Sequence, residues 1–208
     1  MIFAAIAIVF VLLVSSEVWW RKQRPHGEFS RKFVHITVGS FVAFWPYFLS
    51  ANEIRLLALA FLIGVLVSKQ FHVFSAIHSV QRPTLGEVWF ALVVGILAIL
   101  AGHPHIYTIA LLEMSLADGL AAIIGTRFGS ANRYVVFGSP KSIVGTLTFF
   151  VVSCALLGLY EVIAPGMLPV ALIPLVALGA TLLENVGVRG LDNLLVPLFV
   201  AGVLRLFA

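Results

Sequence analysis

Carboxylate side chains recur inside or at the ends of strongly apolar segments of this sequence. They are Glu87, Glu113, Asp118, Glu184 and Asp192. A charged side chain at the centre of a membrane helix costs roughly 2.5 to 3.5 kcal/mol on insertion scales, so residues of this kind are commonly functional. Carboxylate oxygens bind divalent cations and accept protons. These residues are therefore candidates for a metal site or for acid–base chemistry.

Asp118 begins a helical face of small residues. Ala121, Ala122 and Gly125 follow it at i+3, i+4 and i+7, so one face of the helix carries a carboxylate beside a smooth surface. A ligand could approach closely there. The alternative is a helix-packing face on which Asp118 is bound by a neighbouring helix.

The segment from Ser139 to Ser142 is predicted to begin another helix. Ser is a favoured N-cap and Pro a favoured first helical residue, so Ser139 is expected to be the cap, followed by Pro140. Free backbone amides, the helix dipole and Lys141 would then form an anion site. The alternative is an ordinary capped helix with an interfacial lysine. The segment lacks the Gly-x-x-x-x-Gly-Lys spacing of a Walker loop.

A third helix start carries Arg31, Lys32 and His35. Arg31 and His35 share a face by i, i+4 spacing, which places a guanidinium donor beside a titratable imidazole. Positive-inside anchoring alone would explain the two cations but not the histidine. Glu87 lies in the first turn of a further predicted helix, where an acid also complements the helix dipole.

The last loop of the chain brings acids to two helix ends. Glu184 near a helix C-terminus opposes the dipole, so a partner such as Arg189 or a metal ion should compensate it. Asp192, followed by Asn193, could be an N-cap. Oxygen ligands of this kind suit Mg²⁺.

The segments that must position these residues are apolar almost throughout. Of 208 residues, 61% are hydrophobic and 11% are charged, and the mean hydropathy is +1.09, which excludes an ordinary soluble domain. A spanning helix needs about 20 apolar residues and satisfies its own backbone hydrogen bonds, so we predict an all-α helical membrane bundle. The eight predicted spans are residues 2–20, 33–49, 54–71, 88–101, 106–125, 142–163, 168–186 and 192–207.

The distribution of cations predicts the sidedness of the bundle. Eight crossings with the first loop inside place all of the 13 Lys and Arg residues except Arg55 and Arg205 on the cytosolic side. The positive-inside rule then predicts both termini outside, and a multi-pass protein of a prokaryotic plasma membrane whose polar clusters, except Glu113, face the cytosol. The net charge of +4 reflects this sidedness, with membrane lipids or a phosphorylated ligand as partners and no nucleic acid.

Taken together, these residues resemble the polyprenol, dolichol and phytol kinase family, which includes CTP-dependent diacylglycerol kinases. The resemblance runs in the family's order from about residue 30 to residue 208 of a single domain, whereas the first helix, residues 1–22, is less family-like. The matching elements are Arg31-Lys32-x-x-His35, Gly86-Glu87-x-x-Phe90, Asp118-x-x-Ala121-x-x-x-Gly125-x-Arg127-x-Gly129, Lys141-Ser142-x-x-Gly145-Thr146, and Glu184 with Leu191-Asp192-Asn193-Leu194-x-x-Pro197.

The resemblance implies transfer of the γ-phosphate of CTP to a membrane-embedded alcohol, which gives a lipid monophosphate and CDP. The acceptor would be phytol, geranylgeraniol, a polyprenol or diacylglycerol, with Mg²⁺ as cofactor. The family pattern implies a nucleotide site formed by Arg31, Lys32, Asp118, Gly125, Lys141 and Ser142. We add His35, Arg127, Gly129, Ser139 and Gly145 to this site.

Roles in catalysis and metal binding are expected for a smaller set. Asp118 and Lys141 are predicted to be catalytic, and Glu87 is the predicted base that accepts the hydroxyl proton. The predicted Mg²⁺ ligands are Asp118, Glu184, Asp192 and Asn193.

Two other functions stay open. Ser139-Pro140-Lys141 is similar to an element of phosphatidate cytidylyltransferases, which use CTP on a lipid phosphate and release pyrophosphate. A small transporter could also use buried acids and basic loops for an ion or an anionic solute. Against the transporter, the sequence shows no evident pair of repeated halves, and its polar groups favour one face. The sequence does not decide between CTP and ATP, or between a monomer and a homo-oligomer.

Overall fold

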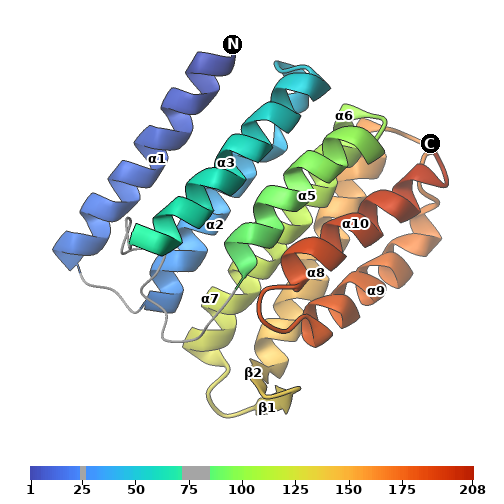
Figure 1. Cartoon of the computed structure of the whole chain (residues 1–208). Helices are drawn as coiled ribbons and strands as arrows, with labels where there is room; N and C mark the ends of the chain where they lie inside the picture. Colours follow the sequence, from blue (N-terminus) through green and yellow to red (C-terminus); the bar gives the residue numbers. More distant parts are fainter. Residues whose placement is uncertain (24–26, 72–84) are drawn as a thin grey trace.

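Long helices running side by side make up most of the structure (Figure 1). The computed structural model describes residues 1–23, 27–71 and 85–208. Its helices are α1 (Ile2–Gln23), α2 (Gly27–Ala43), α3 (Ala51–Phe71), α5 (Gly86–Leu100), α6 (Pro104–Leu112), α7 (Asp118–Phe128), α8 (Ile143–Ile163), α9 (Ile173–Val186) and α10 (Asp192–Arg205). Short 3₁₀ turns at Trp45–Tyr47 and Val170–Leu172 precede α3 and α9.

The predicted apolar segments coincide with these helices, which confirms the helical class. In the described ranges, the stretches long and apolar enough to cross a membrane are Ile2–Trp19, Ala51–Ser68, Pro104–Phe128 and Ile143–Ile163. The helices at Gly86–Leu100 and Val170–Val186 are apolar but shorter. Figure 1 shows both termini at one end of the bundle, as an even number of crossings requires. Eight spans and external termini stay predictions.

The buried core of the bundle is centred on α6. Tyr107, Ile109 and Leu111 are all buried in this helix, which packs against α2, α8 and α10. A helix that is apolar on every side belongs in such an interior position. In contrast, α1 exposes Phe3 and Phe10 and packs on α2 alone among its principal contacts within the described ranges, so it presents a lipid-facing surface.

A π-helical segment at Glu113–Ala117 joins α6 to α7 without ending the apolar stretch. π-helical turns are rare and occur frequently at functional sites. The carbonyl oxygen of Met114 in this segment accepts a hydrogen bond from Nε2 of His35 on α2, at 3.1 Å. The segment thus ends immediately before Asp118 and is bonded to the helix that carries Arg31, Lys32 and His35.

A β-hairpin replaces the helix start predicted at Ser139. Strands β1 (Arg133–Val136) and β2 (Ser139–Ser142) pair in antiparallel fashion, with Tyr134 opposite Lys141. The N-cap of α8 is Ser142, whose Oγ accepts a hydrogen bond from the backbone N–H of Gly145 at 3.1 Å. The prediction was wrong because strand pairing outweighed the local capping preference of Ser139 and Pro140. The class is therefore all-α with one added hairpin.

Glycines allow α7 and α8 to approach each other closely beside the hairpin. A Cβ atom added at Gly125 would lie 2.8 Å from Oγ of Ser142 and 3.0 Å from Cα of Gly145. A Cβ at Gly145 would lie 3.0 Å from the carbonyl oxygen of Ala121. The packing interpretation of this small-residue face therefore holds for Gly125.

We expect Gly125→Ala to destabilise the protein, because the new methyl group would push the backbones of α7 and α8 apart. Overpacking of this kind typically costs about 1 to 3 kcal/mol. The matched control is Gly158→Ala on α8, where an added Cβ meets nothing within 4 Å. Thermal unfolding in detergent should show a lower midpoint for Gly125→Ala and an unchanged or higher midpoint for Gly158→Ala. Equal midpoints for the two variants would contradict the close crossing.

Candidate active site

A cavity of about 880 Å³ opens at the hairpin end of the bundle. Its walls come from α2, α7, the hairpin, the start of α8, the end of α9 and the start of α10. The predicted site residues that line it are Arg31, Lys32, Asp118, Gly125, Ser139, Lys141, Ser142, Gly145, Glu184, Asp192 and Asn193. Segments that are far apart in the sequence thus converge as the motifs suggested.

Lys32 and Asp118 form a buried ion pair between α2 and α7. Nζ of Lys32 donates a hydrogen bond to Oδ2 of Asp118, and the two residues are 86 positions apart in the sequence. Nε2 of His35 lies 3.7 Å from the same carboxylate oxygen. Both charged side chains are more than nine-tenths buried. A buried charge needs such a partner because its desolvation is otherwise costly.

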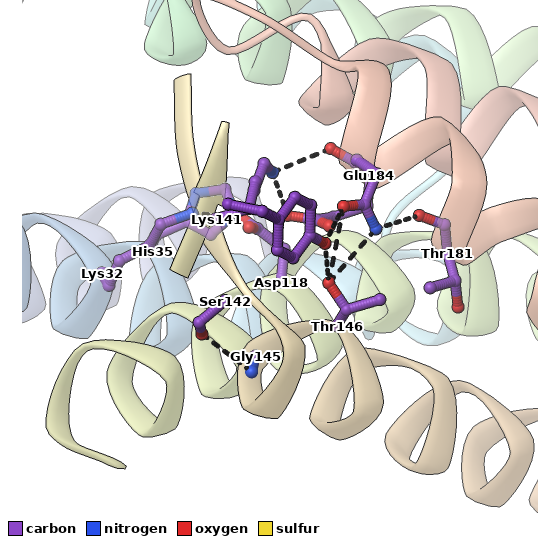
Figure 2. A network of polar contacts seen from close by, with 11 residues as sticks. Lys32, His35, Asp118, Lys141, Ser142, Gly145, Thr146, Thr181 and Glu184 are labelled. Atoms are coloured by element: carbon purple, nitrogen blue, oxygen red, sulfur yellow. Dashed lines mark hydrogen bonds and ion pairs between the residues drawn. The ribbon is translucent and has the colours of Figure 1, made fainter. Parts of the chain in front are cut away.

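A second ion pair joins Lys141 of the hairpin to Glu184 of α9 (Figure 2). Nζ of Lys141 donates to Oε1 of Glu184 and also to the carbonyl oxygen of Glu184, at 2.9 Å. The expected partner of Glu184 was Arg189 or a metal ion, and the structure corrects this to Lys141. Burial lowers the pKa of the Lys141 ammonium, but the carboxylates around it, first Glu184 and then Asp192 and Asp118, together outweigh burial and raise this pKa above its ordinary value.

The charges around this cavity are positive overall. The described lining residues include five cations and three carboxylates, namely Arg31, Lys32, Arg133, Lys141 and Arg189 with Asp118, Glu184 and Asp192. Their formal charges sum to +2. A nucleoside triphosphate that carries one Mg²⁺ has a net charge of about −2, and phosphoryl-transfer sites neutralise this charge with cations and metal. The lining charge therefore matches a metal-bound triphosphate.

Three of the predicted metal ligands are carboxylates that compete for the same cations. Asp192 lies close enough to Asp118 and Glu184 for their carboxylates to repel it. A divalent cation would relieve this repulsion, so Asp118 and Asp192 fit a Mg²⁺ that keeps several waters and binds substrate phosphates. Within residues 1–23, 27–71 and 85–208, no three His, Cys, Asp or Glu side chains form a ready-made metal cage.

Asn193 lines the large cavity but is engaged in a structural hydrogen bond, and the remaining predicted residues lie outside this lining. Nδ2 of Asn193 donates to the carbonyl oxygen of Gly86 at 2.9 Å, which joins α10 to the start of α5. His35 and Glu87 line a second, smaller pocket. Arg127 is exposed and lies over the ring of Phe128 at 5.3 Å, outside the lining of the large cavity. Gly129 packs against Ser142 and is also outside this lining.

The sequence interpretation missed the hydrogen bonds that hold the hairpin in place. The hydroxyl of Tyr134 on β1 donates to Oδ1 of Asn185 and contacts Oγ1 of Thr146. Nδ2 of Asn185 in turn donates to the carbonyl oxygen of Thr181, at 3.0 Å. These bonds tie β1 to α8 and α9, and Lys141 lies opposite Tyr134 in the hairpin. These side-chain contacts join residues 12 and 51 positions apart, so no local spacing in the sequence signalled them.

Comparisons with known proteins identify relatives along most of the chain. The sequence is 32% identical over 193 residues to a protein named phytol kinase from Synechocystis sp., and the match covers 90% of this chain and 82% of that protein. It is 32% identical over 187 residues to a probable chloroplastic phytol kinase of Glycine max, covering 81% of this chain and 62% of that protein.

A probable chloroplastic phytol kinase of Oryza sativa is 30% identical over 199 residues, with 81% of this chain and 61% of that protein covered. The chain thus spans less than two thirds of the length of these two plant relatives. No family model matches the sequence. No solved structure matches the chain at a significant level.

Proposed function

We propose that the phosphoryl donor of this protein is CTP and that its acceptor is an isoprenoid alcohol. The premise is that the chain belongs to the phytol kinase family and is therefore a lipid-alcohol kinase. The products would be a lipid monophosphate and CDP. The observation that carries the proposal is the convergence of two lysine–carboxylate pairs, the buried Lys32–Asp118 and the partly buried Lys141–Glu184, on one cavity.

The lysines of these pairs are suited to bind phosphate. Lys32 and Lys141 already point to carboxylate oxygens in the cavity, and Arg31 lines the same wall. A bound triphosphate would offer them oxygens of higher charge, so each lysine can exchange its carboxylate for a phosphate. The exchange frees Asp118 when the nucleotide arrives. Catalysis of phosphoryl transfer consists mainly of such positioning and charge neutralisation.

The carboxylates of Asp118 and Asp192 would hold Mg²⁺ at the phosphates. The metal supplies charge neutralisation on the transferring phosphoryl group when bound. Asp192 approaches from the start of α10, whereas Asp118 approaches from the start of α7. Glu184, which is bonded to Lys141, would orient that lysine and take part in the metal site only after Lys141 moves.

Transfer requires the alcohol oxygen to attack the γ-phosphorus in line with the leaving nucleoside diphosphate. A bond forms between this oxygen and phosphorus, the bond between phosphorus and the β,γ-bridging oxygen breaks, and CDP leaves with the bonding electrons. The hydroxyl proton passes to Glu87, the proposed base in the first turn of α5.

The test uses purified protein in detergent with Mg²⁺ and CTP or ATP labelled at either the α- or the γ-phosphate, with a panel of lipid alcohols. We expect label from γ-labelled CTP, and none from α-labelled CTP, in a lipid monophosphate. Label from α-labelled CTP in a lipid product would instead identify a cytidylyltransferase. No lipid labelling, with ion-dependent solute uptake by vesicles containing the protein, would identify a transporter.

A further inference from the structure

A second cavity of about 50 Å³ lies beside the large one and is lined from α1, α2, α3, α5 and α10. We infer that this cavity, called the acceptor pocket below, holds the hydroxyl-bearing end of a single-chain isoprenoid alcohol and disfavours diacylglycerol. The inference rests on the proposed kinase function and specifies which alcohols it uses. The chain beyond the first few carbons would lie in the bilayer.

The lining of the acceptor pocket combines a polar part with an apolar part. Arg31, His35, Glu87 and Asn193 contribute polar side chains. Leu13, Val38 and Phe61 contribute apolar walls from three different helices. Such a lining, predominantly apolar with a few polar groups, is what small-molecule sites use to fix the orientation of a ligand. A hydroxyl group would bind at the polar part and the adjoining carbons at the apolar walls.

The acceptor pocket adjoins the phosphate cavity through shared residues. Arg31 and Asn193 line both cavities. His35 lines the acceptor pocket while its Nε2 lies 3.7 Å from Oδ2 of Asp118, a lining residue of the large cavity. A hydroxyl in the acceptor pocket would therefore lie next to phosphates held by Arg31 and Lys32. This contact between an alcohol site and a phosphate site is the arrangement that direct transfer requires.

The tautomer of the His35 ring indicates that this pocket can bind a hydroxyl group. A carbonyl oxygen can only accept a hydrogen bond, so the bond to Met114 means that Nε2 of His35 carries the proton. In the neutral ring Nδ1 is then an acceptor. The ring of Phe90 lies against His35 edge to face, with centroids 5.6 Å apart. The imidazole is held in place, and its remaining nitrogen can accept a hydrogen bond from an alcohol.

The size of the acceptor pocket limits what it can hold. One water needs roughly 10 to 15 Å³ of such space, so about 50 Å³ admits a hydroxyl and a few carbons and no long chain. The rest of a chain must leave between helices toward lipid. The helices that carry Leu13 and Phe61, α1 and α3, also expose apolar side chains, among them Phe10 and Leu59, to that environment.

The same dimensions disfavour diacylglycerol. Its hydroxyl carbon is attached directly to a carbon that carries an ester, so a bulky branch lies next to the reacting oxygen. A space of about 50 Å³ that already holds the hydroxyl group and the adjoining carbons has no room for this branch. A site of this kind therefore discriminates against diacylglycerol by size.

The test compares Leu13→Trp, which fills the pocket from α1, with Val11→Trp on the same helix. Val11 is 63% exposed and faces away from the pocket. We expect Leu13→Trp to raise the KM for geranylgeraniol by at least about tenfold and to change the KM for CTP by less than about twofold, because only alcohol contacts are lost. Val11→Trp should leave both constants unchanged. An unchanged alcohol KM in an active, folded Leu13→Trp protein would overturn the pocket assignment.

Two further measurements separate this inference from the kinase proposal. The wild-type kcat/KM should be at least about 100-fold higher for geranylgeraniol than for dioleoylglycerol, and comparable values would overturn the preference for single-chain alcohols. A long-chain alcohol carrying a photoreactive diazirine near its hydroxyl should label residues 34–38, 61 or 90, in competition with geranylgeraniol. Labelling confined to lipid-facing positions would overturn the pocket even if the protein proved to have no kinase activity.

Discussion

Asp118→Asn should reduce phosphoryl transfer by about 10²- to 10³-fold while leaving the protein folded and inserted, because a preorganised charge at the reacting phosphate is lost. The variant keeps the shape of the side chain and an oxygen that can accept from Lys32. It loses the negative charge that would hold Mg²⁺. Initial rates with γ-labelled CTP and a saturating alcohol measure the effect, and size-exclusion profiles with thermal unfolding report the fold.

Glu113→Gln provides the matched control for this prediction. Glu113 is fully buried five residues earlier in the chain, accepts a hydrogen bond from Oγ of Ser153 at 3.0 Å and is outside the lining of both cavities described above. Its amide analogue can keep this bond, so the rate should change little. Full activity of Asp118→Asn would remove Asp118 from the mechanism, and equal losses in both variants would point to a general effect of removing a buried acid.

Lys141→Met should raise the KM for the nucleotide and lower kcat/KM by about 100-fold, because a charge-assisted contact with phosphate is removed. Glu184→Gln removes the carboxylate that holds Lys141 and should have a smaller effect. A purely structural ion pair would behave differently. In that case each single variant would lose stability by leaving a buried charge unpaired, and the double variant would recover it.

The double variant Lys141→Met/Glu184→Gln therefore decides between the two roles. If Lys141 binds phosphate, the double variant stays as inactive as Lys141→Met even when its thermal midpoint returns to that of the wild type. The KM for the alcohol should stay unchanged throughout, which localises the defect to the nucleotide. Recovery of activity in the double variant would show that the pair supports the fold and has no part in nucleotide binding.

The sequence predicted the elements better than it predicted the contacts between them. Helical segments were recognisable because apolar runs of the length of a membrane span leave few alternatives. Asp118, Lys141 and Asp192 line one cavity, whereas the predicted sidedness stays a prediction. Local spacing in the sequence could not predict the pairing of Lys32 with Asp118, because these residues are 86 positions apart and meet only through tertiary packing.

The errors occurred where local preference competed with tertiary structure. Ser139 and Pro140 favour a helix start, yet residues 139–142 pair with residues 133–136. Phe137 and Gly138, between the two short strands, both have positive φ, which is the backbone of a tight hairpin turn. In the sequence, only Gly138 pointed to such a turn, because the Asn-Gly or Asp-Gly pair that commonly marks it is missing. This hairpin brings Lys141 to Glu184, a partner that spacing along one helix could not have suggested.

The π-helical segment at Glu113–Ala117 sets the angular position of everything that follows it in the same transmembrane stretch. A π-helical turn holds about one residue more than an α-helical turn, and each α-helical residue turns the chain by roughly 100°, so the same residues wound as an unbroken α-helix would rotate α7 by about that angle relative to α6. Asp118 would then face away from Lys32, although the sequence would still contain every residue of the site. One π-helical turn thus fixes the orientation of α7, which carries Asp118, relative to the buried helix α6.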